Sequence, residues 1–231
     1  MKKILIISVL KSFILTSLLS QNVQLFYNIE SLSRSNKADS PPHYGLKITM
    51  NRSDEFGSTF IQSKNAIQDQ NIVSSTIRIS RELRFWKPLW SVQLQFYGGT
   101  SSKSSINSSY SAGVSYQHWS NNKNGMFLAN LSYKRVIHSL DQLQLYSFWN
   151  LKIINGLCET TGIAFANSET TNWKSIRLQA EPQFWFNLNK IKCIPENLGL
   201  SIGMQFELMY SSDTGKYDVM PALGLKWRFG T

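Results

Sequence analysis

After residue 20 the sequence lacks any long apolar run. A membrane-spanning helix needs about 20 consecutive apolar residues, and no later segment approaches that length, so a membrane protein built from helices is excluded. Charged residues are also scarce, at 16% of the chain, against roughly 25% in an ordinary soluble domain. The chain has only two cysteines and three scattered histidines, and no spacing among them indicates a metal or cofactor site.

The N-terminus has the pattern of a secretory signal peptide. Two lysines precede a mostly apolar stretch, 4–19, and small residues fit a cleavage site after Ser20. An uncleaved membrane anchor is the weaker alternative, because Lys11 would lie within the membrane at a cost of about 2.5–3.5 kcal/mol. The predicted division is therefore a signal peptide over 1–20 and a single exported domain over 21–231.

In place of charge the chain has aromatic and uncharged polar residues. Phe, Trp and Tyr make up 13% of it, and Ser, Asn and Gln supply most of the polarity. This balance suits a transmembrane β-barrel, whose outside is apolar and whose lumen is wet. The formal charge of +10 is scattered singly along the chain, which does not favour nucleic acid; a basic pore or an anionic lipid surface explains it as well.

Apolar and polar residues alternate with period two in long rows, as they do in β-strands with one face in each environment. In 218–229, the residues Leu223, Leu225 and Trp227 share one face, and Lys226 lies on the other. Such rows exceed the usual soluble strand of about five or six residues and match the 9–11 that cross a bilayer. The pattern predicts about twelve strands, at 22–29, 43–51, 57–63, 72–84, 90–98, 109–119, 125–135, 141–152, 157–167, 174–188, 197–210 and 218–229.

The predicted fold is therefore all-β: an antiparallel transmembrane β-barrel in the outer membrane of a Gram-negative bacterium. An even number of strands places both ends of the barrel chain on the periplasmic side. A soluble periplasmic β-sandwich or lipocalin-like barrel is the alternative, which the long apolar rows disfavour because each would need an equally long apolar partner. The expected partners are the lipid bilayer, the outer-membrane insertion machinery and small polar solutes, with the barrel as a monomer and no nucleic acid.

Four short motifs resemble an uncharacterised family of outer-membrane barrels. They are 81–86 (RELRFW), 97–99 (YGG), 111–114 (SAGV) and, above all, 181–188 (EPQFWFNL). That family is similar to the Tsx-type nucleoside-specific channel-forming proteins. The resemblance covers nearly all of the exported domain, and it implies a twelve-stranded barrel that passes small polar solutes, nucleosides being the expected ones.

If the apolar rows face lipid, the opposite rows line the bore. Aromatic side chains there offer faces on which a flat base could stack, and Gln and Glu can hydrogen-bond its edges or a ribose. The alternative is that these residues only fill and stiffen a small barrel. The residues expected along the solute path are Arg78, Glu82, Tyr97, Trp119, Tyr146, Phe148, Arg177, Glu181, Gln183, Trp185, Glu207, Lys226 and Arg228.

Three residues leave alternatives open. Arg81 has the parity of the lipid-facing row, so either it lies near the periplasmic interface and reaches water, or a β-bulge shifts the register there. Cys158 and Cys193 both fall on the periplasmic side, where they form a disulfide or remain two unpaired thiols.

The function predicted from the sequence is passive passage of small polar solutes across the outer membrane, without catalysis. The main alternative is a non-conducting structural or adhesive barrel, and a less favoured one is an outer-membrane lipid hydrolase. Gly199-Leu200-Ser201-Ile202-Gly203 matches the Gly-x-Ser-x-Gly string of serine hydrolases. That motif requires a sharp turn between a strand and a helix, whereas here it lies in a predicted strand, so Ser201 is interpreted as a small lumen residue.

Overall fold

The described residues of the computed structural model are 20–29, 44–68, 71–87, 89–102, 106–120, 124–137, 139–169, 175–191, 194–195 and 198–229. They form twelve strands, each antiparallel to its neighbours, and β1 pairs with β12 to close the wall. The strands are β1 (Ser20–Asn28), β2 (Tyr44–Asp54), β3 (Gly57–Gln68), β4 (Asn71–Lys87), β5 (Trp90–Ser101), β6 (Ser109–Trp119), β7 (Gly125–Val136), β8 (Gln142–Ile153), β9 (Cys158–Glu169), β10 (Ile176–Asn187), β11 (Leu200–Ser211) and β12 (Lys216–Phe229).

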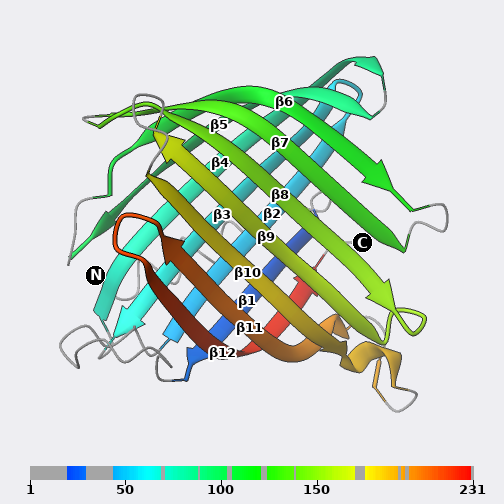
Figure 1. Ribbon diagram of the computed structural model, residues 1–231. Helices are drawn as coiled ribbons and strands as arrows, with labels where there is room; N and C mark the ends of the chain where they lie inside the picture. Colours follow the sequence, from blue (N-terminus) through cyan, green and yellow to red (C-terminus); the bar gives the residue numbers. More distant parts are fainter. Residues whose placement is uncertain are drawn as a thin grey trace.

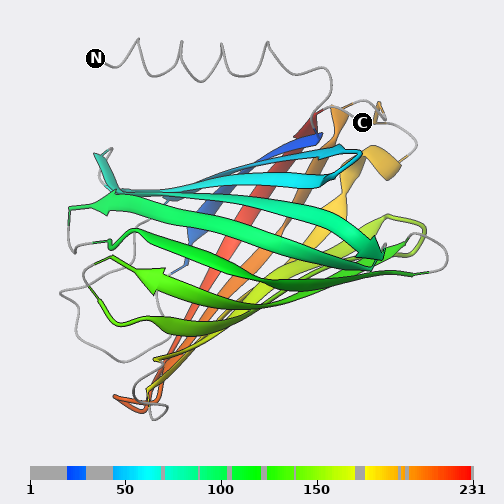
Figure 2. The same cartoon turned by 90° about the horizontal axis from the view of Figure 1, so that it is seen from above.

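The predicted twelve-stranded antiparallel barrel is confirmed. Its strands are steeply tilted around the wall (Figure 1), and in the view turned by 90° β1 (blue) lies beside β12 (red) where the barrel closes (Figure 2). We call the end where β1 begins and β12 ends the terminal end, at the right of Figure 1, and the opposite end the distal end. A short 3₁₀ helix, η2 (Leu188–Lys190), follows β10 at the terminal end. The described residues contain no helix that is long and apolar enough to cross a membrane.

The outer face of the barrel is apolar, as the alternation predicts. Leu223, Leu225 and Trp227 on β12 are 53, 44 and 47% exposed, whereas Lys226 between them is only 2% exposed. The same pattern recurs around the wall, from Leu94 on β5 to Phe184 on β10. Because apolar side chains cover the outside and polar ones are buried inside, the barrel has the inverted arrangement of a transmembrane β-barrel.

Aromatic rings pair on neighbouring strands toward the ends of the barrel. Trp90 and Tyr116 lie edge to face at 5.2 Å near the terminal end, and Tyr210 and Tyr217 lie 5.0 Å apart near the distal end. Trp and Tyr are favoured where hydrocarbon meets water, since one part of the ring is apolar and the other polar. The two sets of rings mark the expected upper and lower edges of the membrane-embedded band.

Arg81 lies on the outer face near the terminal end, the first of its two predicted alternatives. Its guanidinium donates to both carboxylate oxygens of Asp54 at 2.8 Å, and Nη1 also donates to Thr59. Asp54 is the last residue of β2, next to the hairpin that leads into β3. Arg81 pairs in regular register with Thr59 on β3 and with Leu94 on β5, and the register shift between β4 and β5 comes only after Leu83.

Two predictions fall partly or wholly outside the described residues. The signal peptide lies outside them except for Ser20, so its cleavage remains a prediction. Cys158 is partly buried at the start of β9 and is bonded to no other described cysteine, and Cys193 is not among the described residues. The disulfide between the two cysteines therefore also stays a prediction.

Candidate functional site

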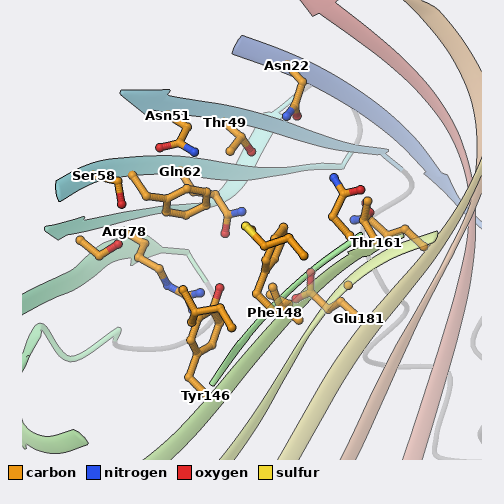
Figure 3. Close-up of a pocket in the computed structure, with 18 of the residues that line it drawn as sticks. Asn22, Thr49, Asn51, Ser58, Gln62, Arg78, Tyr146, Phe148, Thr161 and Glu181 are labelled. Carbon is orange, nitrogen blue, oxygen red and sulfur yellow. The ribbon is translucent and has the colours of Figure 1, made fainter. Parts of the chain in front are cut away.

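Among the described residues, two cavities lie inside the barrel. The first has a volume of about 530 Å³ and reaches the terminal end, where Asn22, Lys152 and Arg228 line it. The second has a volume of about 310 Å³ and reaches the distal end, where Ser74 and Asn167 line it. In Figure 3 side chains from several strands of the wall project into the first cavity. Together the cavities follow the bore from one end toward the other.

Five residues, each from a different strand, line both cavities and therefore form the boundary between them. Two are uncharged polar residues, two are charged and one is apolar. Their strands, β3, β4 and β5 on one side and β9 and β10 on the other, face each other across the bore. The boundary residues are Gln62, Arg78, Gln95, Ile163 and Glu181.

Glu181 anchors a charge network that crosses the bore at this boundary. Its carboxylate, only 5% exposed, lies 3.4 Å from Nζ of Lys47 and 3.1 Å from Nζ of Lys64. Lys64 also pairs with Glu207 at 3.2 Å, and Gln179 donates to both carboxylates at 3.1 Å. Because both charges of a buried pair are needed, removing one partner typically costs about 3–5 kcal/mol. Loss of a single partner should therefore destabilise the barrel, and the paired side chains narrow the bore.

A second network lies closer to the terminal end. Glu159 on β9 pairs with Lys226 at 3.4 Å and with Arg228, both on β12, and it accepts a hydrogen bond from Asn150. Glu159 and Lys226 are almost fully buried. Lys226 also places its ammonium 4.4 Å from the centre of the Trp185 ring, a cation–π contact.

Two glycines allow Trp185 to lie flat against the inner wall. A Cβ at Gly203 would lie 2.7 Å from the ring, and one at Gly224 would lie 2.8 Å from it. Trp185 also contacts Phe26, with ring centres 5.9 Å apart, and its indole donates to Gln183. The tryptophan thus supports the wall and positions Lys226, and its own ring is 2% exposed.

Arg78 at the boundary is held by aromatic rings. Its guanidinium lies 4.4 Å from the ring centre of Phe165 on β9, 5.7 Å from that of Tyr146 on β8 and 5.9 Å from that of Tyr97 on β5. Within the described part of the chain, its Nε and Nη1 are buried without a hydrogen-bond acceptor. A buried donor without an acceptor costs roughly 1–3 kcal/mol. The aromatic rings therefore restrain the guanidinium, while two of its hydrogen-bond donors remain unpaired.

An apolar strip faces Arg78 from the opposite wall. It consists of inward-facing side chains on three adjacent strands, β7, β8 and β9. Figure 3 shows Tyr146 and Phe148 of this strip reaching into the first cavity beside Arg78. The strip is formed by Leu128, Tyr146, Phe148, Ile163 and Phe165.

The structure places most of the predicted path residues on the inner face. Tyr97 and Glu207 line the second cavity, and Trp185 is buried against the inner wall without lining either cavity. Arg177 is exposed at the distal end of β10 and lines neither cavity, and the side chain of Trp119 is outside what the structure describes. The predicted residues that line the first cavity are Arg78, Glu82, Tyr146, Phe148, Glu181, Gln183, Lys226 and Arg228.

Sequence reasoning missed inner-face residues on β3, β7 and β9. Lys64 and Glu159 complete the two charge networks. Ile163 and Phe165 were not predicted to face the bore, because apolar residues were expected to face lipid. On β9 the outward positions are small residues such as Gly162 and Ala164, and the larger apolar residues point inward. The charge of Glu159 was the available signal, since a carboxylate cannot face lipid without a partner and thereby fixes the parity of β9.

The lining of the first cavity is basic. Six basic side chains face it, against the three carboxylates of Glu82, Glu159 and Glu181. The described residues contain no cluster of three or more potential metal ligands. Ser201 is 1% exposed in β11 and donates to Asn187, so the Gly-x-Ser-x-Gly string does not form a nucleophile elbow.

Residues 20–229 match the family model described as "Domain of unknown function (DUF5020)". The chain belongs to this family. No curated protein sequence matches the chain significantly. Membership agrees with the predicted resemblance to an uncharacterised family of outer-membrane barrels. It does not indicate which solute the barrel passes.

Solved porin structures share the fold. The NanC porin superposes with a TM-score of 0.55 at 9% identity, over 90% of this chain and all of that one. The KdgM porin superposes with a TM-score of 0.51 at 8% identity, over 91% of this chain and 99% of that one. A structure of KdgM in complex with disordered oligogalacturonate gives 0.52 at 8% identity, over the same shares of the two chains. These similarities to porins concern the fold, and they do not support a Tsx-type nucleoside specificity.

Proposed function

We propose that this DUF5020 protein is an outer-membrane channel for the passive entry of small polar solutes, with a preference for anions. It works as a monomeric barrel, delivered to the membrane by its signal peptide and the barrel insertion machinery. The observation that carries the proposal is the bore itself. Two polar cavities run along the inside of a barrel whose outer face is apolar.

The anion preference is supported by the charges along the bore. Basic side chains outnumber carboxylates in both cavities, and Arg78, Lys134 and Lys152 have no ion pair in the networks above. An excess of fixed positive charge in a narrow bore raises the local concentration of anions and repels cations. The porin similarities agree with a channel, and the KdgM complex has an oligogalacturonate as its ligand.

Nucleosides were the finer expectation, and the structure gives them little support. Stacking of a base needs an open aromatic face. Of the predicted rings that the structure describes, Trp185 is covered by Lys226, and both Tyr97 and Tyr146 lie against Arg78, which leaves Phe148 in the first cavity to stack a base. We therefore place nucleosides below small anions as solutes of this barrel.

A non-conducting barrel is the second candidate, and one observation favours it. The ion pairs of Glu181 and Glu159 join strands across the interior and narrow the bore. If they close it, the barrel is a structural element of the membrane. The lipid-hydrolase alternative has no comparable support, because Ser201 is buried against Asn187.

Single-channel recording of the refolded protein in a planar bilayer tests the proposal. We expect discrete current steps that small organic anions reduce more strongly than nucleosides or neutral sugars do. A barrel that is folded, as judged by heat-modifiable migration on a gel, and that gives no steps would favour the structural candidate. Steps reduced only by nucleosides would restore the nucleoside prediction and refute the anion preference.

A further inference from the structure

We infer that the boundary between the two cavities binds a small organic anion with an apolar, flat body, such as an aromatic carboxylate. The inference deepens the proposed channel function and rests on it for biological meaning. Binding at the boundary is nevertheless measurable whether or not the barrel conducts.

The first step concerns the charge at the boundary. Two charged residues line both cavities, Arg78 and Glu181. Glu181 is neutralised by two lysines and also accepts from Gln179. Arg78, in contrast, is paired with no carboxylate in these networks, although its Nε and Nη1 are buried and can reach an anion only if the neighbouring rings move. An anionic group that enters the boundary therefore finds one unneutralised cation there.

The second step concerns what surrounds that cation. Aromatic rings on β5, β8 and β9 contact Arg78 and fix its position. A guanidinium is planar, always charged and able to form two parallel hydrogen bonds with one carboxylate. Since its neighbours are apolar and the site is largely shielded from water, an ionic contact there is stronger than at an exposed arginine.

The third step concerns the body of the ligand. The apolar strip faces Arg78 from the opposite wall, and Ile163 within it lines both cavities. Leu128, Ile163 and Phe165 are each 7% exposed. Their side chains offer no hydrogen bonds, so this wall does not complement the hydroxyl groups of a sugar acid. It complements a ring or a short hydrocarbon chain, which loses water on contact.

The fourth step concerns space. The cavity beside Arg78 has a volume of about 530 Å³, within the roughly 300–1,000 Å³ of small-molecule sites in proteins. A single aromatic ring with a carboxylate fits such a volume with water to spare. Polar side chains from β1 to β3, among them Gln62 and Thr49, face the strip across the cavity (Figure 3). A bound ligand would thus have an apolar side, an anionic end at Arg78 and a wetted side.

Titration calorimetry on the refolded, detergent-solubilised barrel tests the inference with three probes. Benzoate carries both features, gluconate carries the anion without an apolar body, and benzyl alcohol carries the ring without the charge. Loss of the charge-assisted hydrogen bond is expected to weaken binding about tenfold or more, and so is loss of the apolar contact. We therefore expect benzoate to bind at least about tenfold more tightly than either control probe.

Variants locate the site. Arg78→Gln is expected to bring benzoate down to the affinity of benzyl alcohol, and Ile163→Ser to bring it down toward that of gluconate. Arg177→Gln is the control, because Arg177 is exposed at the distal end of β10 and lines neither cavity; it should leave benzoate affinity nearly unchanged. If Arg78→Gln does not fold, the benzoate affinities of Ile163→Ser and of the control variant still show whether benzoate binds at the boundary.

Benzoate that binds no more tightly than gluconate would overturn the inference, as would a loss caused equally by Arg177→Gln. Calorimetry and conductance separate the two proposals. Binding that depends on Arg78 without current steps would leave the site and refute the channel. Current steps without benzoate binding would leave the channel and refute the site.

Discussion

Glu181 on β10 reaches across the bore to Lys64 on β3, with 3.1 Å between the carboxylate oxygen and Nζ. Around the wall the two strands are separated by β11, β12, β1 and β2. The contact is therefore a bridge through the lumen and not a pairing of neighbours. Glu181 also pairs with Lys47. One carboxylate therefore fixes the positions of two ammonium groups in the bore.

Glu181→Gln should destabilise the barrel and increase its anion selectivity. The substitution leaves the buried Lys47 without a carboxylate, and removing one partner of a buried pair costs about 3–5 kcal/mol. Urea unfolding in lipid vesicles measures the free energy, and the reversal potential in a salt gradient measures the selectivity. Glu207→Gln is the control, because Lys64 keeps Glu181 when Glu207 is neutralised. Equal losses in the two variants would contradict the central place of Glu181.

A charge on the outer face should be far more costly than one on the inner face. Leu145 on β8 is 51% exposed on the outside, and its neighbour Gln144 is 4% exposed and lines the second cavity. Leu145→Arg is expected to lower the free energy of unfolding in vesicles by up to about 2–4 kcal/mol, the cost that an arginine has at the bilayer midplane. Gln144→Lys can reach water in the cavity and should cost less. The opposite order would mean that the faces of β8 are reversed.

Gly224→Ala should disturb the packing of Trp185, whereas Gly45→Ala should not. A Cβ at Gly224 would lie 2.8 Å from Trp185 and 3.0 Å from Phe26, but one at Gly45 would lie 3.7 Å from Phe26, an ordinary contact. Overpacking typically costs about 1–3 kcal/mol. Urea unfolding followed by tryptophan fluorescence compares the two variants, and similar midpoints would show that Trp185 is not confined as described.

Asp54→Asn should leave the stability of the barrel almost unchanged. The ion pair of Asp54 with Arg81 is 37% and 29% exposed on its two sides, and exposed pairs contribute little because water solvates both charges. Arg81 also keeps its hydrogen bond to Thr59. The unfolding midpoint in vesicles checks this, and a large decrease would place the pair within the hydrocarbon layer instead of at its edge.

The fold could be predicted from the sequence because lipid and lumen impose opposite demands on alternate residues. The row from Leu223 to Trp227 shows it most clearly, with Lys226 between apolar neighbours that are all exposed to the outside. Strand ends were less predictable. β3 was expected to end at residue 63 but continues to Gln68, because backbone pairing with β2 and β4 extends it through a polar stretch that has no alternating pattern.

The interior could be predicted only where alternation was strong. On β10 the inward positions of Glu181 and Gln183 followed from the outward row of Phe184 and Phe186. On β9 the outward residues are small, so nothing in its hydrophobic pattern revealed that Phe165 faces inward against Arg78. Contacts across the bore join residues far apart in sequence, and their partners depend on strand number and register together.

The reversal potential of single channels under a potassium chloride gradient tests the central claim most directly. The account predicts open channels whose reversal potential is shifted from zero toward the equilibrium potential of chloride. The reason is that basic side chains outnumber carboxylates along the bore. Arg78→Gln and Lys152→Gln should each move it toward zero. Cation-selective channels, or folded barrels that never conduct, would contradict the account.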